Sequence, residues 1–216
     1  MTGWKIHQMK DKVKEIEAFL DDLYPNPKCE LNYNKDYELL IATVLSAQTT
    51  DKKVNSVTAI LFSKYDTLEK LRDADINDIK NIIRPIGTYN KKSEYVKKIA
   101  SYLIENCSKV VPNDREIIEK IPGAGRKTAN VVLNNLYDFK AIAVDTHVAR
   151  VSKRLGLCKE HDDVLTIEKK LEKKFKKSVW GRRHHQMVLF GRYNCKAQNP
   201  SCTNCKISNL CKFKNK

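Results

Sequence analysis

Apolar residues recur three and four positions apart along most of the chain, which is the spacing of one face of an α-helix. One such stripe runs from Val13 to Leu23, and another runs from Val96 to Ile104. No segment sustains the alternation of apolar and polar residues that marks a half-buried β-strand. The chain has 216 residues, enough for one large domain or two smaller ones with a proper core. The sequence therefore predicts an all-α fold with short linkers.

Polar residues that commonly cap helices stand between these stripes. Asp66–Glu69 resembles a capping box, and Asp75 and Asp114 precede further helical segments. We expect Ser93 to begin the helix that carries the second stripe.

A tight pair of glycines follows one short helical segment. The run Ile121-Pro122-Gly123-Ala124-Gly125 can turn the chain sharply and expose backbone N–H groups. A helix beginning at Arg126 would direct its own free N–H groups to the same place, which makes an anion site. Lys127, on the first turn of that helix, lies where a phosphate backbone would arrive. The spacing fits neither a P-loop nor a dinucleotide-binding loop, but a purely structural turn with a solvated lysine stays open at this point.

The chain is strongly basic, with 41 Lys and Arg against 26 Asp and Glu and a formal charge of +15. Such an excess attracts polyanions and supplies affinity for phosphate backbones. The lysines between Lys169 and Lys177 also suit a solvated helix face, so charge favours nucleic acid without establishing it. The N-terminal residues lack the apolar core of a signal peptide, and no stretch is long and apolar enough to span a bilayer. We therefore expect a soluble cytoplasmic protein.

Four of the seven cysteines crowd into the last 22 residues, with the spacing C-x6-C-x2-C-x5-C. A reducing compartment disfavours disulfides, so four thiolates on a short loop indicate a metal centre. Either a tetrahedral zinc or a [4Fe–4S] cluster satisfies four cysteines, and the generic chemistry does not choose between them. The four are Cys195, Cys202, Cys205 and Cys211.

Together these features resemble the endonuclease III family of DNA glycosylase/AP lyases, within the helix-hairpin-helix glycosylase superfamily. Glu38–Asp51 is similar to the family's early helix and wedge loop, and Ile121–Val132 is similar to its hairpin and following helix. Val144–Val148 resembles the catalytic aspartate segment. The cysteine spacing is the one with which this family binds a [4Fe–4S] cluster, which favours iron–sulfur over zinc.

The resemblance implies two all-α domains with a DNA-binding cleft between them. Residues 29–139 would form a six-helix barrel with the helix-hairpin-helix. Residues 1–28 and 140–216 would form the iron–sulfur cluster domain. The implied protein is a monomer that binds double-stranded DNA containing damaged pyrimidines or abasic sites.

The implied activity is bifunctional DNA glycosylase and AP lyase chemistry in base excision repair. It would remove oxidised or damaged pyrimidines through a lysine Schiff base and cut 3′ to the abasic site by β-elimination. Lys127 would be the nucleophile and Asp145 the acidic group that assists it. The residues expected to contact DNA are Gln48, Thr88, Gly123, Gly125, Arg126 and His147. Thr88 stands where relatives often carry a larger apolar residue.

Several alternatives remain at this point. Gln48 suits an ordinary exposed helix end, Asp145 suits a helix cap, and the basic run from Arg182 to His185 suits either phosphates or solvent. An adenine-removing mismatch glycosylase shares the hairpin and a similar cysteine loop, but it typically lacks the lysine and carries a further C-terminal domain. A non-enzymatic DNA-binding module explains the glycines and the charge, but not Lys127 together with Asp145 and four patterned cysteines.

Overall fold

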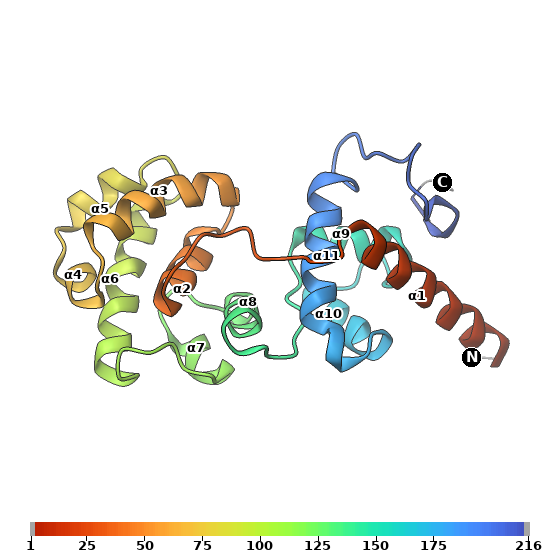
Figure 1. Ribbon diagram of the computed structural model, residues 1–216, viewed down its shortest axis with the longest axis horizontal. Coiled ribbons are helices and arrows are strands. Elements are labelled where there is room, and N and C mark those ends of the chain that lie inside the picture. Colours follow the sequence, from red (N-terminus) through yellow and green to blue (C-terminus); the bar gives the residue numbers. More distant parts are fainter. Residues whose placement is uncertain (1–2, 214–216) are drawn as a thin grey trace. The chain divides into compact units, whose positions relative to one another are not determined.

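The computed structural model describes residues 3–213, with side chains from residue 8 onward. Within this range every regular element is a helix, so the predicted all-α class is confirmed (Figure 1). No helix in the described range is both long and apolar enough to cross a membrane. The chain divides into two compact units, residues 29–139 and residues 1–28 with 140–216, and each is described by itself.

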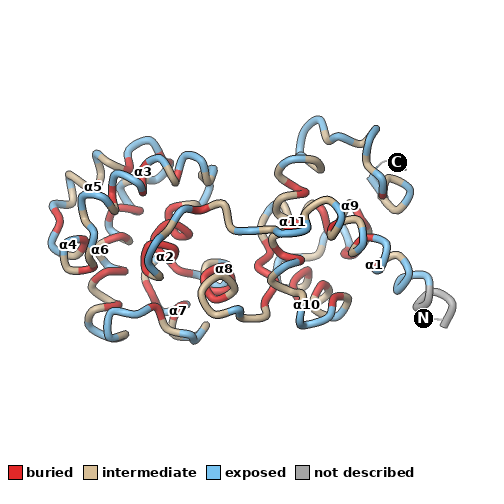
Figure 2. Tube along the Cα trace, viewed as in Figure 1, coloured by how far each residue is buried: buried red, intermediate tan, exposed pale blue. Residues whose placement is uncertain are grey.

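The unit of residues 29–139 is built around one almost entirely buried helix. This central helix, α2, packs against α3, α6 and α8, and it appears as buried in Figure 2. Most of its residues are apolar, as expected of a helix surrounded by others, although it also buries Glu38 and Thr43. The helices of this unit are α2 (Asp36–Leu45), α3 (Asp51–Lys64), α4 (Leu68–Asp73), α5 (Ile76–Ile83), α6 (Tyr89–Asn106), α7 (Arg115–Lys120) and α8 (Arg126–Tyr137).

Side-chain caps set several of these helix starts. The Thr67 hydroxyl accepts from the Lys70 N–H (3.2 Å), and the Asp75 carboxylate accepts from the Asn77 N–H (2.9 Å). Asp114 caps α7 in the same way. The predicted caps at Asp75 and Asp114 are confirmed. The capping box predicted for Asp66–Glu69 is wrong in register, because the cap is Thr67 and Asp66 instead pairs with Lys70 (2.7 Å).

The predicted helix start at Ser93 is wrong. The helix α6 begins four residues earlier, at Tyr89, directly after Thr88 in a left-handed conformation (φ 56°). Ser93 lies buried inside the first turns, where its hydroxyl donates to the Asn90 carbonyl (2.7 Å). Serine satisfied by a backbone carbonyl within a helix is a known alternative to its capping role.

The unit of residues 1–28 and 140–216 has a separate apolar core. Its longest helix, α1, packs against α11, and α11 also packs against α9. Two short 3₁₀ turns, η1 (Lys177–Val179) and η2 (Ser208–Leu210), complete it. Its α-helices are α1 (Gly3–Leu23), α9 (Thr146–Arg154), α10 (Val164–Lys174) and α11 (Trp180–Tyr193).

An ion-pair network around the buried Arg183 joins α1 to α11. The two arginines of the run from Arg182 to His185 therefore bind carboxylates of α1, which corrects the expectation that this run binds phosphates. Arg183 is only 4% exposed, and its guanidinium binds both carboxylate oxygens of Asp21 (2.6 and 2.9 Å) and one of Glu17 (3.2 Å). Hydrogen bonds from Arg183 hold the pKa of Asp21 well below its usual range. Arg182, although exposed, also pairs with Asp21 (2.7 Å). These two arginines therefore hold α1 in place.

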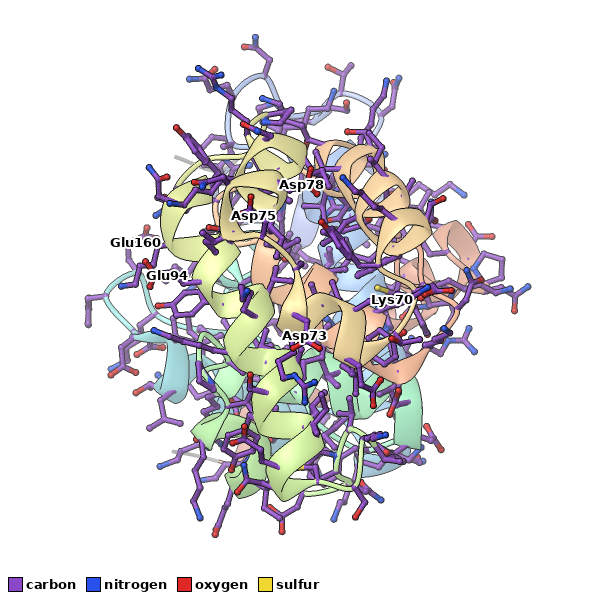
Figure 3. All side chains as sticks on the ribbon, turned by 90° about the vertical axis from the view of Figure 1, so that its left-hand side faces the viewer. Lys70, Asp73, Asp75, Asp78, Glu94 and Glu160 are labelled. Carbon is purple, nitrogen blue, oxygen red and sulfur yellow. The ribbon has the colours of Figure 1, made fainter. Side chains whose placement is uncertain are left out.

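One face of the other unit carries a group of acidic residues. Figure 3 shows Asp73, Asp75 and Asp78 on the α4–α5 segment. Asp73 pairs with Arg72 (2.7 Å), Asp78 pairs with Lys64 (2.7 Å), and Asp75 caps α5. Two of these three carboxylates therefore have a cationic partner, and the third serves a helix start.

Candidate functional site

The glycine turn between α7 and α8 requires glycine at one of its two positions, Gly123. Gly123 has φ +85°, and a Cβ placed there would lie 2.8 Å from the Tyr95 ring and 3.0 Å from Val44 Cγ1. Both the backbone and the space therefore require glycine. Gly125 differs, because a Cβ placed on it would meet no atom within 4 Å. Packing therefore does not require glycine at position 125, and its backbone is accessible from solvent.

The N-terminus of α8 is open to an anion. Gly125 is its N-cap and has no side chain to accept a hydrogen bond, and the first turn contains no acidic residue. The helix has 12 residues, so its free N–H groups and partial positive charge are concentrated at this end. Arg126 and Lys127 are exposed there. The structure thus places three of the predicted DNA-contacting residues beside the predicted nucleophile.

Asp145 caps the helix α9. It follows the buried extended segment Ala141–Val144, and its Oδ1 accepts from the Val148 N–H (2.8 Å). The capping alternative is therefore confirmed. Capping also fixes the half-buried carboxylate at the end of a rigid element, which suits a group that must act at a defined position.

His147 is held by contacts that sequence reasoning missed. The Arg150 guanidinium donates to His147 Nδ1 (3.1 Å), to the Gly191 carbonyl (2.6 Å) and to the Cys195 carbonyl (3.0 Å). Since Nδ1 accepts, the neutral imidazole carries its proton on Nε2, which can donate to a phosphate oxygen. The sequence signal for this close packing was Gly191, a glycine within the apolar stretch of α11.

Gln48 and Thr88 lie on two exposed turns of the unit of residues 29–139. Both have left-handed backbones, with φ of 55° and 56°. Lys92, which sequence reasoning also missed, is 3% exposed and reaches the first of these turns. Its ammonium donates to the Ala47 carbonyl (2.8 Å) and to Thr49 Oγ1 (3.1 Å). Burial lowers the pKa of Lys92.

The four clustered cysteines line one cavity of about 140 Å³, together with Phe19 and Leu23 of α1. None of the seven cysteines, all of which lie within the described range, forms a disulfide. Burial is the main cause that raises the pKa of the Cys205 thiol. The other three clustered thiols raise this pKa further, so the four lie within electrostatic reach of one another.

Four thiols around one cavity have the chemistry of a metal centre. A single zinc ion takes four sulfurs about 2.3 Å away. A [4Fe–4S] cluster takes one thiolate on each iron.

Basic side chains hold the backbone of the cysteine segment. Arg154 donates to the Lys196 carbonyl (2.7 Å), and its Nη1 lies 3.3 Å from Cys195 Sγ. Lys12 of α1 donates to the Leu210 carbonyl (2.7 Å). Such outer contacts orient the ligands of a metal site and tune its charge.

Comparison with known proteins gives one consistent family. The family described as "HhH-GPD superfamily base excision DNA repair protein" matches residues 41–177. Endonuclease III of Bacillus subtilis (strain 168) is 45% identical over 203 residues, which cover 93% of each chain. Endonuclease III of Escherichia coli (strain K12) is 41% identical over 207 residues, 96% of this chain and 98% of that one.

Solved structures agree with this result. A trapped endonuclease III–DNA covalent intermediate with an estranged adenine superimposes with a TM-score of 0.90 at 43% identity, over 100% of this chain and 98% of that one. A thermostable thymine-DNA glycosylase shares the fold with a TM-score of 0.83 at 23% identity, over 95% and 97% of the two chains.

Proposed function

Because this chain belongs to the endonuclease III family of HhH-GPD base excision DNA repair proteins, we propose that Lys127 is the nucleophile of a DNA glycosylase and AP lyase. The observation that carries this assignment is the exposed Lys127 amine on the first turn of an uncapped helix, directly after the glycine turn. Phosphate bound at that helix end would bring a deoxyribose to the amine.

The proposed reaction begins with a nucleotide turned out of the duplex, because a stacked base cannot be reached. The neutral Lys127 amine attacks C1′, the glycosidic bond breaks, and the base departs with its electron pair and takes up a proton. Asp145 accepts the proton that the amine loses, directly or through water. The C1′–O4′ bond then breaks as O4′ takes up a proton, which opens the sugar ring and leaves an iminium between C1′ and the lysine nitrogen. This iminium acidifies the C2′ proton, and loss of that proton breaks the C3′–O bond by β-elimination. Only a primary amine can form this Schiff base.

The remaining predicted residues hold DNA in this proposal. The backbone at Gly123 and Gly125 and the Arg126 side chain bind phosphate, and His147 donates to phosphate through Nε2. Gln48 fills the space left by the extruded nucleotide, and Thr88 contacts the opposite strand. The estranged adenine in the solved complex supports a damaged pyrimidine as the substrate base, since adenine pairs with thymine.

We further infer that residues 29–139 form the hairpin domain and that residues 1–28 with 140–216 form an iron–sulfur domain. Cys195, Cys202, Cys205 and Cys211 would hold a [4Fe–4S] cluster, which fits their shared cavity. When bound, the cluster would cross-link a segment that has little apolar core of its own. The protein would act where DNA is found, in the cytoplasm at the nucleoid.

The test is borohydride trapping on a duplex that contains an abasic site. The active protein should give a covalent protein–DNA adduct, because reduction fixes the Schiff base. Lys127→Ala should abolish the adduct, whereas Lys120→Ala, which removes an exposed amine at the end of α7, should retain it. Trapping by Lys127→Ala at the normal rate would refute the assignment.

A further inference from the structure

We propose that Lys92 is a positioning residue that holds the Gln48 and Thr88 turns in the geometry with which they enter the DNA duplex. The inference rests on the proposed function of those two turns. It concerns how the protein opens the duplex, and it is separate from the chemistry at Lys127.

The first observation is the place of the Lys92 hydrogen bonds. The ammonium binds residues 47 and 49, the two neighbours of Gln48. Gln48 itself is exposed and has φ of 55°, a left-handed conformation that is unfavourable for a residue other than glycine. Two bonds that flank a strained residue restrict the turn to the strained conformation. The Gln48 side chain therefore projects from a fixed base.

The second observation is that the same residue belongs to the Thr88 turn. The Lys92 N–H donates to the Thr88 carbonyl (3.1 Å), which closes the first turn of α6. Thr88 is the N-cap of that helix, and its side chain accepts no capping hydrogen bond. Lys92 thus bonds to the Gln48 turn through its side chain and to the Thr88 turn through its backbone N–H.

The third observation is the electrostatic cost. Lys92 is buried, and no carboxylate among the described residues pairs with it or influences its pKa. A buried ammonium without a counter-charge is costly, and a methionine would fill a similar volume without that cost. Stability therefore does not explain the charge at this position. Three N–H donors on one flexible stem can reach two acceptors on a neighbouring turn, which an apolar side chain cannot do.

The principal experiment compares Lys92→Met with Lys98→Met, a control on the same helix whose lysine is exposed and pairs with Glu94 (3.5 Å). Opening of the duplex is followed by the fluorescence of 2-aminopurine placed opposite a thymine glycol. Lys92→Met should lower kcat/KM for base removal from the duplex by about 10–100-fold, as expected of a misplaced positioning group. It should also reduce the fluorescence gain, while Lys98→Met matches the unmodified protein in both measurements.

Chemistry is measured separately by borohydride trapping on a single-stranded oligonucleotide with a preformed abasic site. No duplex has to be opened there, so Lys92→Met should trap at the rate of the unmodified protein. Equal losses on single-stranded and duplex substrates would overturn the positioning role. Unchanged duplex kinetics and fluorescence would overturn it as well.

A second variant keeps the test independent of folding in Lys92→Met. Thr49→Val removes one of the two acceptors and keeps the side-chain volume, so it should cause a smaller loss of the same kind. The double variant should lose less than the sum of the two single losses, because both act through one contact. Additive losses would refute the contact. Absence of any adduct with the unmodified protein would refute the proposed function itself, which is a distinct result.

Discussion

Gly191 lies against the backbone of His147. A Cβ placed on Gly191 would lie 2.8 Å from His147 Cβ, 3.2 Å from its Cα and 3.3 Å from its carbonyl oxygen. The start of α9 therefore rests directly on α11. Since Asp145 caps the same end of α9, this contact fixes the position of the carboxylate as well.

Gly191→Ala should consequently impair the proposed reaction without touching DNA. The added methyl group must displace backbone atoms, which costs about 1–3 kcal/mol in a packed interior. A shift of about 1 Å in Asp145 would lower the rate up to about 100-fold. Urea unfolding and the single-turnover rate on a lesion-containing duplex measure the two effects. A variant with normal stability and a normal rate would show that α9 is not held by this contact.

The two hairpin glycines should respond differently to alanine. Gly123→Ala meets the Tyr95 ring and a left-handed backbone, so its melting temperature should fall by several degrees, the equivalent of about 1–3 kcal/mol. Gly125→Ala meets no neighbouring atom and should melt like the unmodified protein. If phosphate approaches this end of α8, Gly125→Ala should still weaken binding to an abasic duplex. Thermal unfolding and a titration with labelled DNA separate these expectations.

The Asp21–Arg183 pair predicts a specific dependence of stability on pH. Because its folded pKa is depressed, the Asp21 carboxyl contributes stability above the ordinary aspartate pKa of about 3.9. That contribution is lost as pH falls below this value toward the folded pKa. Asp21→Asn should thus lower the free energy of unfolding at pH 7, and the difference should shrink in acid.

Asp22→Asn is the matched control for this pair. Asp22 binds Lys206 at 3.0 Å, but both side chains are largely exposed, and such pairs contribute about 0–1 kcal/mol. Its loss should be small at every pH. A pH-independent deficit in Asp21→Asn would contradict the electrostatic explanation.

Removal of one clustered thiol should disrupt the proposed cofactor site. Cys202→Ser should lose the broad visible absorbance of an iron–sulfur cluster, bind less iron and unfold at a lower temperature. Cys107→Ser, at a cysteine of the other unit, should keep the iron and the absorbance. Purified protein that contains zinc and no iron would reverse the choice of cofactor.

Features that depend on neighbours in sequence could be predicted, and those that depend on distant partners could not. The start of α8 at Arg126 and the caps at Thr67 and Asp75 follow from residues a few positions apart. Arg183, in contrast, suggested a solvated basic run, because its partner Asp21 lies 162 positions earlier. A charged side chain is exposed by default, and only the folded structure reveals a distant carboxylate.

The candidate site divides in the same way. The glycine turn, Lys127 and Asp145 stand in short motifs with their own chemistry, so sequence reasoning could propose them. Lys92 and Gly191 carry no such motif. Lys92 bonds to Ala47, 45 positions earlier, and Gly191 packs on His147, 44 positions earlier.

The contact between Lys12 and Leu210 joins residues 198 positions apart, and Phe19 packs edge-on against Phe190 at 5.4 Å between ring centroids. The helix α1 thus leaves the ribosome well before these partners do. The middle unit has a core of its own and can fold while the chain is still being made. Until translation reaches α11, the apolar face of α1 lacks the helix that packs against it, and this interval exposes the nascent chain to aggregation and chaperones.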